Sequence, residues 1–427
     1  MHYSRIFMAV AGVFLAAHAF AAPKPVAAPA VVELELSHQL DEERAARLEP
    51  LVEHFNAQQK DVQVKVVRRV EGDAPKELSL VSREDYSRMV AGKAKFKPLH
   101  EVMREAKQPL DASKLSPELR DGLTDAKGQL VALPIAYSTP VLYVNKAAFR
   151  KAGLNPDMPP KTWAAVQDIS GKLYESGSQC PFTTSWPAWV HIDNLSAWNG
   201  VDVTDAKGHL AINGLVQIKH VAMLATWHKS KYFSYFGRRD EADRRFAAGD
   251  CAMLTSTSSL SATLGDNKSL DVGVAALPYH DDVRGAPQNT LADGASLWVA
   301  SGLKSAETKG VAKFVSYILG PEVQIQMTVA GGFLPMTPVA RAAAGSKLLK
   351  GDLAALQISY GQLHGRSMTS PVRVSQLERV RVIVEEELEA VWANRKPAKE
   401  ALDQAVQRGN AVMQPVSVSK AKSKSGR

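Results

Sequence analysis

The sequence predicts an α/β protein of two lobes, each built on a mostly parallel sheet flanked by helices. Short apolar runs alternate with amphipathic stretches of helical period, which is the pattern of βαβ units. The chain has 427 residues, more than one hydrophobic core usually supports. Three short segments, at residues 138–140, 277–280 and 333–335, separate these units where the chain would cross between lobes. Three such crossings predict two discontinuous lobes joined by a hinge.

The first part of the chain reads as strand, helix, strand. Strands are predicted at residues 31–36, 62–67 and 130–135, and a helix at residues 41–58. In that helix apolar residues recur at i, i+3, i+4 and i+7, which gives one buried face. These residues are Leu48, Leu51, Val52 and Phe55. A second apolar run follows Pro140, and a short amphipathic helix then ends at Gly153.

The same alternation continues to the end of the chain. Helices are predicted at residues 162–176, 216–229, 242–248 and 311–319, and strands at 182–185, 251–256, 272–276 and 294–300. A terminal pair of helices is predicted at residues 379–392 and 397–413. The crossings then assign residues 31–137 plus 279–332 to an N-terminal lobe, and 138–278 plus 333–414 to a C-terminal lobe. In such folds a ligand binds between the lobes, at the carboxyl ends of the strands.

The two ends of the chain differ from this body. Arg5 precedes an apolar run over residues 6–20, and Ala19-Phe20-Ala21 forms an A-x-A cleavage site. This predicts a signal peptide over residues 1–21 and an exported, periplasmic protein, because so short a run cannot span a membrane. Residues 22–30 predict a Pro/Ala linker, and 415–427 a disordered basic tail.

The formal charge of +8 does not favour a nucleic-acid partner. Five of the positive charges lie at the two ends of the chain: Arg5, Lys420, Lys422, Lys424 and Arg427. Without these five the remaining charge is +3, which is modest for a body of this size.

Two cysteines, Cys180 and Cys251, each stand at the start of an apolar run. They are therefore expected at the same end of adjacent parallel strands. In an oxidising compartment they form either a disulfide or a pair of buried free thiols. No further ligands stand at metal-site spacing, so neither a metal nor another cofactor is predicted.

Several motifs carry a resemblance to a known family. The stretch 133–163, LPIAYSTPVLYVNKAAFRKAGLNPDMPPKTW, contains a strand, a Ser138-Thr139-Pro140 crossing and a Pro-rich helix start. Further motifs follow in order: WPAW at 186–189, NLSAWNG at 194–200, FSYFGR at 233–238, GDCAM at 249–253, APQN at 286–289, GASLW at 294–298 and RVIVEEELE at 381–389. From residue 130 to 413 the chain resembles bacterial extracellular solute-binding proteins, the family that includes maltose-binding proteins, and within it the members that bind sn-glycerol 3-phosphate.

The resemblance implies a two-lobed periplasmic-binding-protein fold of type II. It also implies that the protein captures sn-glycerol 3-phosphate or a related glycerophosphodiester and delivers it to the permease subunits of an ABC importer. A small phosphorylated polyol and that permease are the expected partners, and a monomer is expected. Another phosphorylated polyol or sugar, or a sensor or scaffold role outside transport, are the alternatives.

The family's ligand contacts fall on particular residues of this sequence. The resemblance implies ligand contacts at three matching positions: Ser138 in the crossing motif, Gly294 in GASLW and Arg381 in RVIVEEELE. Two more positions are substituted: Thr257 stands for a Ser and keeps the hydroxyl, while Phe333 stands for a Tyr and loses the phenol.

The N-terminal third departs from the family pattern. The region after residue 66 is shorter, a family Tyr has no counterpart, and Ser82 stands about where a Glu is expected. Fewer polar partners for the ligand's hydroxyls imply weaker or altered specificity.

Arg381 is expected to hold the phosphate, because a guanidinium donates two parallel hydrogen bonds to such a group. Ser138 and Thr257 would add hydroxyls, and Gly294 would allow close backbone approach. Without the resemblance, the sequence favours a surface ion pair of Arg381 with Glu385, one helical turn away. Trp163 reads either as a core residue or as a face for the ligand's glycerol carbons.

The motifs of common enzymes are missing from the sequence. Ser301 and Lys304 match S-x-x-K, but none of its companion motifs follows. No G-x-S-x-G, H-E-x-x-H or phosphate-loop motif is present. His38 and His191 have no spaced partner and are expected at the surface or in the cleft. The sequence therefore predicts a binding protein and not an enzyme.

Overall fold

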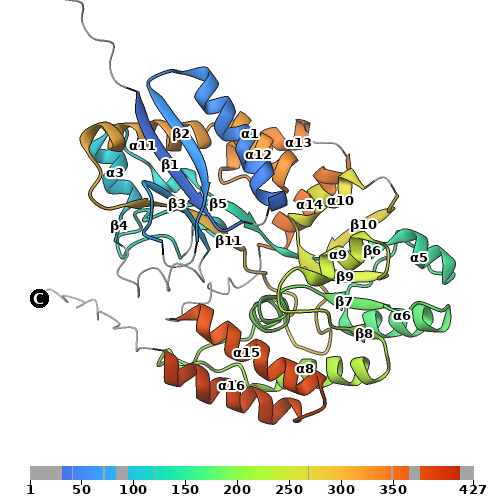
Figure 1. Cartoon of the computed structure of the whole chain (residues 1–427). Helices are drawn as coiled ribbons and strands as arrows, with labels where there is room; N and C mark the ends of the chain where they lie inside the picture. Colours follow the sequence, from blue (N-terminus) through green and yellow to red (C-terminus); the bar gives the residue numbers. More distant parts are fainter. Residues whose placement is uncertain are drawn as a thin grey trace, which may run out of the picture.

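A computed structural model describes residues 31–40, 42–70, 73–82, 95–120, 122–267, 269–347, 350–364 and 376–413. The predicted signal peptide, the linker and the basic tail lie outside these ranges. Two sheets with helices around them form the two halves of the molecule (Figure 1). The α/β class and the two-lobed architecture predicted from the sequence are confirmed.

The first sheet has the strand order β2-β1-β3-β11-β4, and β5 also pairs with β11. Its strands are β1 (Val32–His38), β2 (Val62–Arg68), β3 (Leu78–Ser82), β4 (Phe96–Lys97), β5 (Leu133–Ser138) and β11 (Asp293–Ala300). β1 is parallel to both of its neighbours, whereas β11 is antiparallel to β3, β4 and β5.

The second sheet has the order β10-β6-β9-β7-β8. Its strands are β6 (Pro140–Asn145), β7 (Phe182–Thr184), β8 (Phe233–Ser234), β9 (Met253–Thr257) and β10 (Val272–Ala276). β7 is parallel to β8 and β9, while β6 is antiparallel to β9 and β10.

Both sheets are therefore mixed, and the prediction of mostly parallel sheets was wrong in this detail. The antiparallel pairs involve the strands next to the crossings, namely β5, β6, β10 and β11. A strand that enters a lobe directly from the other sheet needs no βαβ connection, so it is free to run against its neighbours.

The first sheet and its helices share one hydrophobic core. That core takes side chains from α1 (Glu42–Gln58), α3 (Leu99–Glu105), α4 (Pro117–Arg120), α11 (Ser305–Ile318) and α12 (Pro321–Gly331). A 3₁₀ turn, Ala112–Lys114, precedes α4. In α1 the predicted apolar face packs inward, with Val52 and Phe55 buried.

Two helices, α13 (Pro338–Lys347) and α14 (Lys350–Gly361), lie where the sequence pattern predicts none. Their buried residues Ala344, Leu356 and Tyr360 join the core of the first sheet. α12 was likewise missed because buried residues surround it, Val323, Ile325 and Met327 among them, so it has no single apolar stripe. The lobe boundaries proposed above remain a prediction.

The second sheet packs helices on both faces. Along β6, Leu142 and Val144 point into one core, and Val141 and Tyr143 point into another, as strand alternation requires. The helices of the larger core are α5 (Lys146–Lys151), α6 (Trp163–Glu175), α7 (Leu195–Trp198), α8 (Leu215–Lys229), α15 (Leu377–Trp392), α16 (Ala398–Val412) and a π-helix at Trp189–Asn194. The smaller core takes α9 (Glu241–Ala247) and α10 (Leu260–Asp266).

Local signals fix where these helices begin. The Thr162 hydroxyl caps α6 by accepting from the Ala165 N–H at 3.2 Å, and the Asn145 side chain caps α5 in the same way at 3.1 Å. Among the described residues, no helix combines the length and the apolar character needed to cross a bilayer.

Candidate ligand-binding site

The carboxyl ends of the parallel strands in the first sheet meet at one edge. β1, β2 and β3 end there at His38, Arg68 and Ser82. Since β11 is antiparallel, it begins at the same edge, where its Ala295 pairs with Ser82 and its Asp293 pairs with Ser138. This edge thus gathers two predicted site residues, Ser82 and Ser138, beside Gly294.

The crossing at Ser138 continues directly into the second sheet. Pro140 lies opposite Thr257, and the Ser258 N–H donates to the Thr139 carbonyl at 2.7 Å. In return the Thr139 N–H donates to the Ser258 hydroxyl at 3.1 Å. The structure therefore brings Ser138 and Thr257 together on the two sides of one crossing, although 119 residues separate Thr139 from Ser258.

Arg381 connects the two halves of the molecule. It lies on α15, is 9% exposed, and donates from Nη2 to the Asp193 carboxylate at 2.8 Å and to the Asp293 carboxylate at 2.9 Å. Its Nε also donates to Asp193, at 3.1 Å. Asp193 lies on the π-helix of the second half, and Asp293 at the edge of the first sheet. The guanidinium thus has one carboxylate partner in each half of the molecule.

A second ion pair holds α15 in place. Arg238 donates from Nε to the Glu389 carboxylate at 2.9 Å and from Nη2 at 2.5 Å. The hydrogen bond from Arg238 lowers the pKa of Glu389, so this carboxylate stays ionised. Glu389 lies two helical turns beyond Arg381, which fixes the helix that presents the guanidinium.

Gly294 makes a close contact, but with the protein's own backbone. A Cβ at this position would lie 1.9 Å from the Ala136 carbonyl oxygen on β5. The absence of a side chain is therefore needed for the pairing of β5 with β11. This explains the glycine whether or not a ligand also approaches it.

Phe333 follows the end of α12, at the position predicted for the third crossing. Its ring is partly buried against the core of the first sheet, and a side chain at Gly331 would overlap it. The adjacent Gly332 ends α12 in the left-handed conformation, at φ +64°. A Cβ there would lie 2.5 Å from the Ser259 carbonyl oxygen, so the third crossing lies against the turn that follows β9.

Trp163 is fully buried, at 0% exposure, in the core of the second half. Its ring packs against His220, with centroids 4.7 Å apart, and against His191, at 5.5 Å. This position favours the core alternative over a face for the ligand.

His191 is also fully buried, so the expectation of a surface or cleft residue was wrong. His191 Nδ1 lies 2.9 Å from His220 Nε2, and His220 Nδ1 lies 3.1 Å from His280 Nε2. The partners come from the π-helix, α8 and the second crossing, so no local spacing in the sequence reveals them. Burial lowers the pKa of His191 to about 3 and that of His280 to about 4. All three imidazoles are therefore neutral.

His38 is buried too, at the end of β1. Its Nδ1 accepts the Leu40 N–H at 3.2 Å, which places the ring proton on Nε2. Among the described residues, no cluster of His, Cys, Asp or Glu has the arrangement of a metal site.

Cys180 and Cys251 form a disulfide, with Cα atoms 4.6 Å apart. The two residues precede β7 and β9, which are parallel neighbours, as the sequence predicted. The disulfide therefore lies at the amino ends of these strands, away from the edge that carries Thr257.

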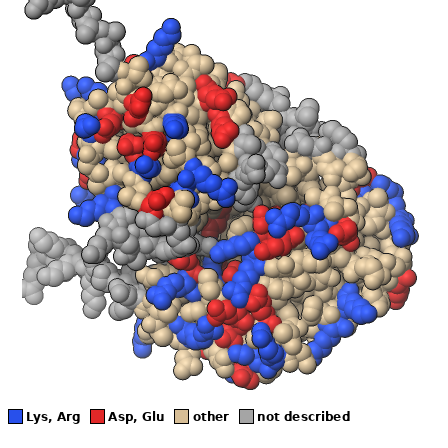
Figure 2. Space-filling model, viewed as in Figure 1, with Lys and Arg blue, Asp and Glu red and all other residues tan. Residues whose placement is uncertain are grey.

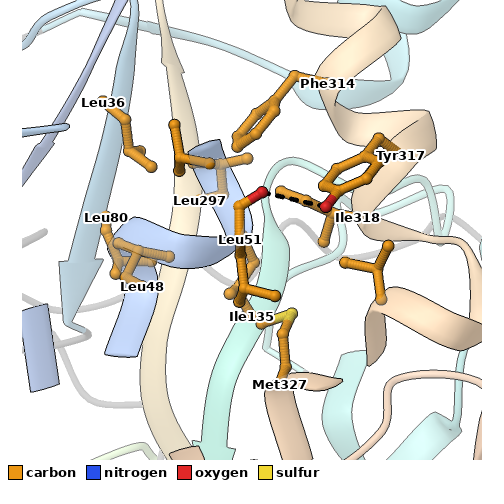
Figure 3. A pocket seen from close by; sticks show the side chains of 12 residues that line it. Leu36, Leu48, Leu51, Leu80, Ile135, Leu297, Phe314, Tyr317, Ile318 and Met327 are labelled. Carbon is orange, nitrogen blue, oxygen red and sulfur yellow. Dashed lines mark hydrogen bonds between the residues drawn. The ribbon is translucent and has the colours of Figure 1, made fainter. Parts of the chain in front are cut away.

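Figure 2 shows a hollow between the two halves of the molecule, with basic and acidic side chains on its border. A different, apolar cavity of about 10 Å³ lies inside the first half, under α1, α11 and α12 (Figure 3). It is lined by residues such as Leu51, Phe314 and Met327. A space of this size holds at most one water, so it is a packing gap and not a ligand site.

The residues that sequence reasoning missed are Asp193 and Asp293. Asp293 directly precedes the GASLW motif, and Asp193 directly precedes NLSAWNG. Their positions beside two recognised motifs are the signal that would have pointed to them.

Two α/β halves with a polar edge between them define the class of two-lobed solute-binding proteins. The chain belongs to a family described as bacterial extracellular solute-binding proteins, whose sequence model matches residues 50–353. This confirms the resemblance drawn from the motifs.

Individual relatives agree with this family. The sn-glycerol-3-phosphate-binding periplasmic protein UgpB of Pectobacterium atrosepticum is 35% identical over 411 residues, covering 90% of this chain and 92% of its own. The protein of the same name from Escherichia coli strain K12 is 36% identical over 424 residues, covering 90% and 93%.

Solved structures share the fold at lower identity. UgpB from Mycobacterium tuberculosis in complex with glycerophosphocholine has a TM-score of 0.72 and 19% identity, covering 90% of this chain and 98% of its own. Maltose-bound MalE3 of T. maritima has a TM-score of 0.71 and 15% identity, covering 88% and 99%.

Proposed function

We propose that this protein is the periplasmic solute-binding component of an ABC importer and that it captures sn-glycerol 3-phosphate or a glycerophosphodiester between its lobes. Its relatives at 35% and 36% identity carry the name of sn-glycerol-3-phosphate-binding periplasmic proteins, and the alignment covers nine-tenths of the chain. The single structural observation behind the proposal is Arg381, a buried guanidinium at the meeting of the lobes. The captured solute would then pass to the permease subunits without covalent change.

The carboxylates around Arg381 bear on the choice of ligand. The Arg381 guanidinium lies between two carboxylates, in a place where Asp193 is 9% and Asp293 14% exposed. A phosphomonoester dianion would be repelled more strongly here than a phosphodiester monoanion. This favours a glycerophosphodiester over glycerol 3-phosphate itself.

Ser138 and Thr257 would contact the ligand from the crossing, with Ser82, Gly294 and Phe333 on the first-lobe side. Trp163 supports the second lobe from its core and does not reach the ligand. The lobe boundaries, 31–137 plus 279–332 and 138–278 plus 333–414, belong to the same proposal.

Isothermal titration calorimetry on the mature protein tests this function. We expect glycerophosphocholine to bind about five- to tenfold more tightly than glycerol 3-phosphate, from a difference of about 1 kcal/mol. Maltose is the comparison ligand, since it fits the fold but not the charged site. Heat from maltose and none from either phosphate compound would contradict the proposal.

A further inference from the structure

A second arginine, Arg69, lies at the edge of the first sheet where β2 ends. Its backbone N–H donates to the His38 carbonyl at 2.8 Å, which continues the pairing of β1 with β2 by one residue. Because β1, β2 and β3 are parallel, Arg69 belongs to the same edge as Ser82 and Asp293. In Figure 1 the ends of β1 and β2 point toward the half of the molecule that holds α15. Arg69 therefore lies on the first-lobe side of the crevice.

The environment of Arg69 is unusual for a charged side chain. Arg69 is 9% exposed, yet its neighbour Arg68 is exposed. Its buried Nε has no hydrogen-bond partner, and no carboxylate of the described residues forms an ion pair with its guanidinium. Arg381, the other buried arginine of the described residues, has such partners in Asp193 and Asp293.

A buried guanidinium without a counter-charge lowers the stability of the folded protein. A buried charged group without a hydrogen-bond partner is typical of ligand-binding sites. In contrast to Arg381, whose charge is already balanced, Arg69 has its full charge available for an incoming anion.

We propose that the Arg69 guanidinium binds an oxyanion of the captured solute on the first-lobe side of the crevice. The inference deepens the proposed function, since it assumes that the crevice holds a phosphorylated solute. It gives the solute a cationic partner in the lobe where the sequence has lost two contacts.

The position of Arg69 also bears on the shape of the ligand. β2 and β11 are separated by β1 and β3, so three strand spacings of about 4.8 Å place Arg69 about 14 Å from Asp293 along the edge. A solute held at Arg69 that also reaches the Arg381 cluster must extend along this edge.

The test uses Arg69→Gln, with Arg68→Gln as a matched control that removes the same charge one residue earlier on the exposed side. Binding of glycerophosphocholine is measured by calorimetry. Loss of charge-assisted hydrogen bonds should weaken binding about ten- to hundredfold in Arg69→Gln. Arg68→Gln should stay within about twofold of the parent protein, because an exposed charge is well screened. Equal affinity in the parent and in Arg69→Gln would overturn the proposal.

The ligand-free melting temperature separates a binding role from a structural one. A residue kept for binding destabilises the free protein, so Arg69→Gln should melt at the same or a higher temperature than the parent. A clear fall in the ligand-free melting temperature would mean that Arg69 supports the fold, and it would also overturn the proposal.

A third measurement uses inorganic phosphate, so that the inference does not depend on the solute's identity. Millimolar phosphate should raise the melting temperature of the parent protein and of Arg68→Gln, but not that of Arg69→Gln. If neither glycerol compound binds the parent but phosphate still acts through Arg69, the proposed ligand is wrong and the anion site stands. If the phosphate shift is the same in all three proteins, the anion site is wrong.

Discussion

The Nη2 atom of Arg381 lies 2.9 Å from the carboxylate of Asp293, and this contact joins residues 88 positions apart that belong to opposite halves of the molecule. The same nitrogen contacts Asp193, on the π-helix of its own half. The group expected to bind the ligand's phosphate is thus already held by two anions of the protein. Any anionic solute that reaches Arg381 must compete with them.

Removing one of these anions should change ligand preference. We expect Asp293→Asn to raise the affinity for glycerol 3-phosphate about fivefold, since it removes a repulsive charge worth about 1 kcal/mol. Calorimetry at low salt measures the effect. Asp271→Asn, which removes an exposed partner of Arg150, is the control and should change affinity little. An unchanged affinity in Asp293→Asn would show that the carboxylate does not face the ligand.

Removing the cation should affect both binding and stability. Arg381→Ala removes the cation that faces Asp193 and Asp293 in a buried place, which should lower the free energy of unfolding by about 3 kcal/mol. Urea unfolding measures this loss, and calorimetry should show weaker binding. Arg379→Ala, at an exposed position of the same helix, should leave both quantities near the parent values. A stable Arg381→Ala protein would mean that the two aspartates readily find other partners or water.

The buried histidines should make the protein sensitive to acid. They are neutral in the folded state, with lowered pKa values of about 3 for His191 and about 4 for His280, while in the unfolded chain their pKa is near 6.5. The unfolded chain therefore binds more protons, and stability is full above pH 6.5 and falls as the pH drops toward 4. Within that pH window each of these histidines lowers the free energy of unfolding by up to about 1.4 kcal/mol for every pH unit of acidification.

Urea unfolding at pH 7.5, 6.0 and 5.0 checks this dependence. His191→Phe should reduce the slope of stability against pH by about one histidine's share, since Phe cannot take up a proton. A slope that His191→Phe does not alter would place the acid sensitivity in other groups.

The disulfide should stabilise the protein without affecting the ligand. It closes a loop of 71 residues, and replacement of both cysteines by alanine should cost about 4 kcal/mol of unfolding free energy. Unfolding with and without a reductant measures the cost in the parent protein. Ligand affinity should stay within about twofold, because the disulfide is at the opposite strand ends from Thr257. A large loss of affinity in the double alanine variant would contradict this separation.

Gly294 and Gly345 offer a matched pair of substitutions. Gly294→Ala should disrupt the pairing of β5 with β11, because its Cβ would overlap the Ala136 carbonyl; a loss of several kcal/mol, or failure to fold, is expected. Gly345→Ala, inside α13 with open space around it, should instead raise stability by about 0.5 to 1 kcal/mol. Thermal unfolding compares the two. A well-folded Gly294→Ala protein would show that β5 can shift away from β11 at little cost in free energy.

The sequence predicts what depends on local pattern and misses what depends on distant partners. Regular apolar spacing located α1, and apolar runs located β1 and β2. The two cysteines were placed correctly because each precedes a strand of one parallel pair. The partners of Arg381 come from elements 188 and 88 residues away, so nothing near Arg381 in the sequence indicates them. His191 was misplaced for the same reason, since its polar neighbours lie on α8 and at a crossing.

Helices α12 to α14 were missed for a different reason. A helix buried on most of its sides has no amphipathic stripe, and α12 has Gln324 and Thr328 buried among its apolar residues. Similarly, the direction of β5 and β6 follows from the lobe crossing and not from their composition. The resemblance to the family placed the expected contacts on Ser138, Gly294 and Arg381, but it gave no indication of Asp193 or Asp293.

The contact of Gly332 with the Ser259 carbonyl bears on how the two halves move. The third crossing lies directly against the turn after β9, with no room for even a methyl group. We therefore expect the two halves to rotate about this point as a hinge. A shear motion of one half past the other would break the contact. A larger side chain at residue 332 would push against the Ser259 backbone. It would then hold the two halves at one angle, with or without a bound solute.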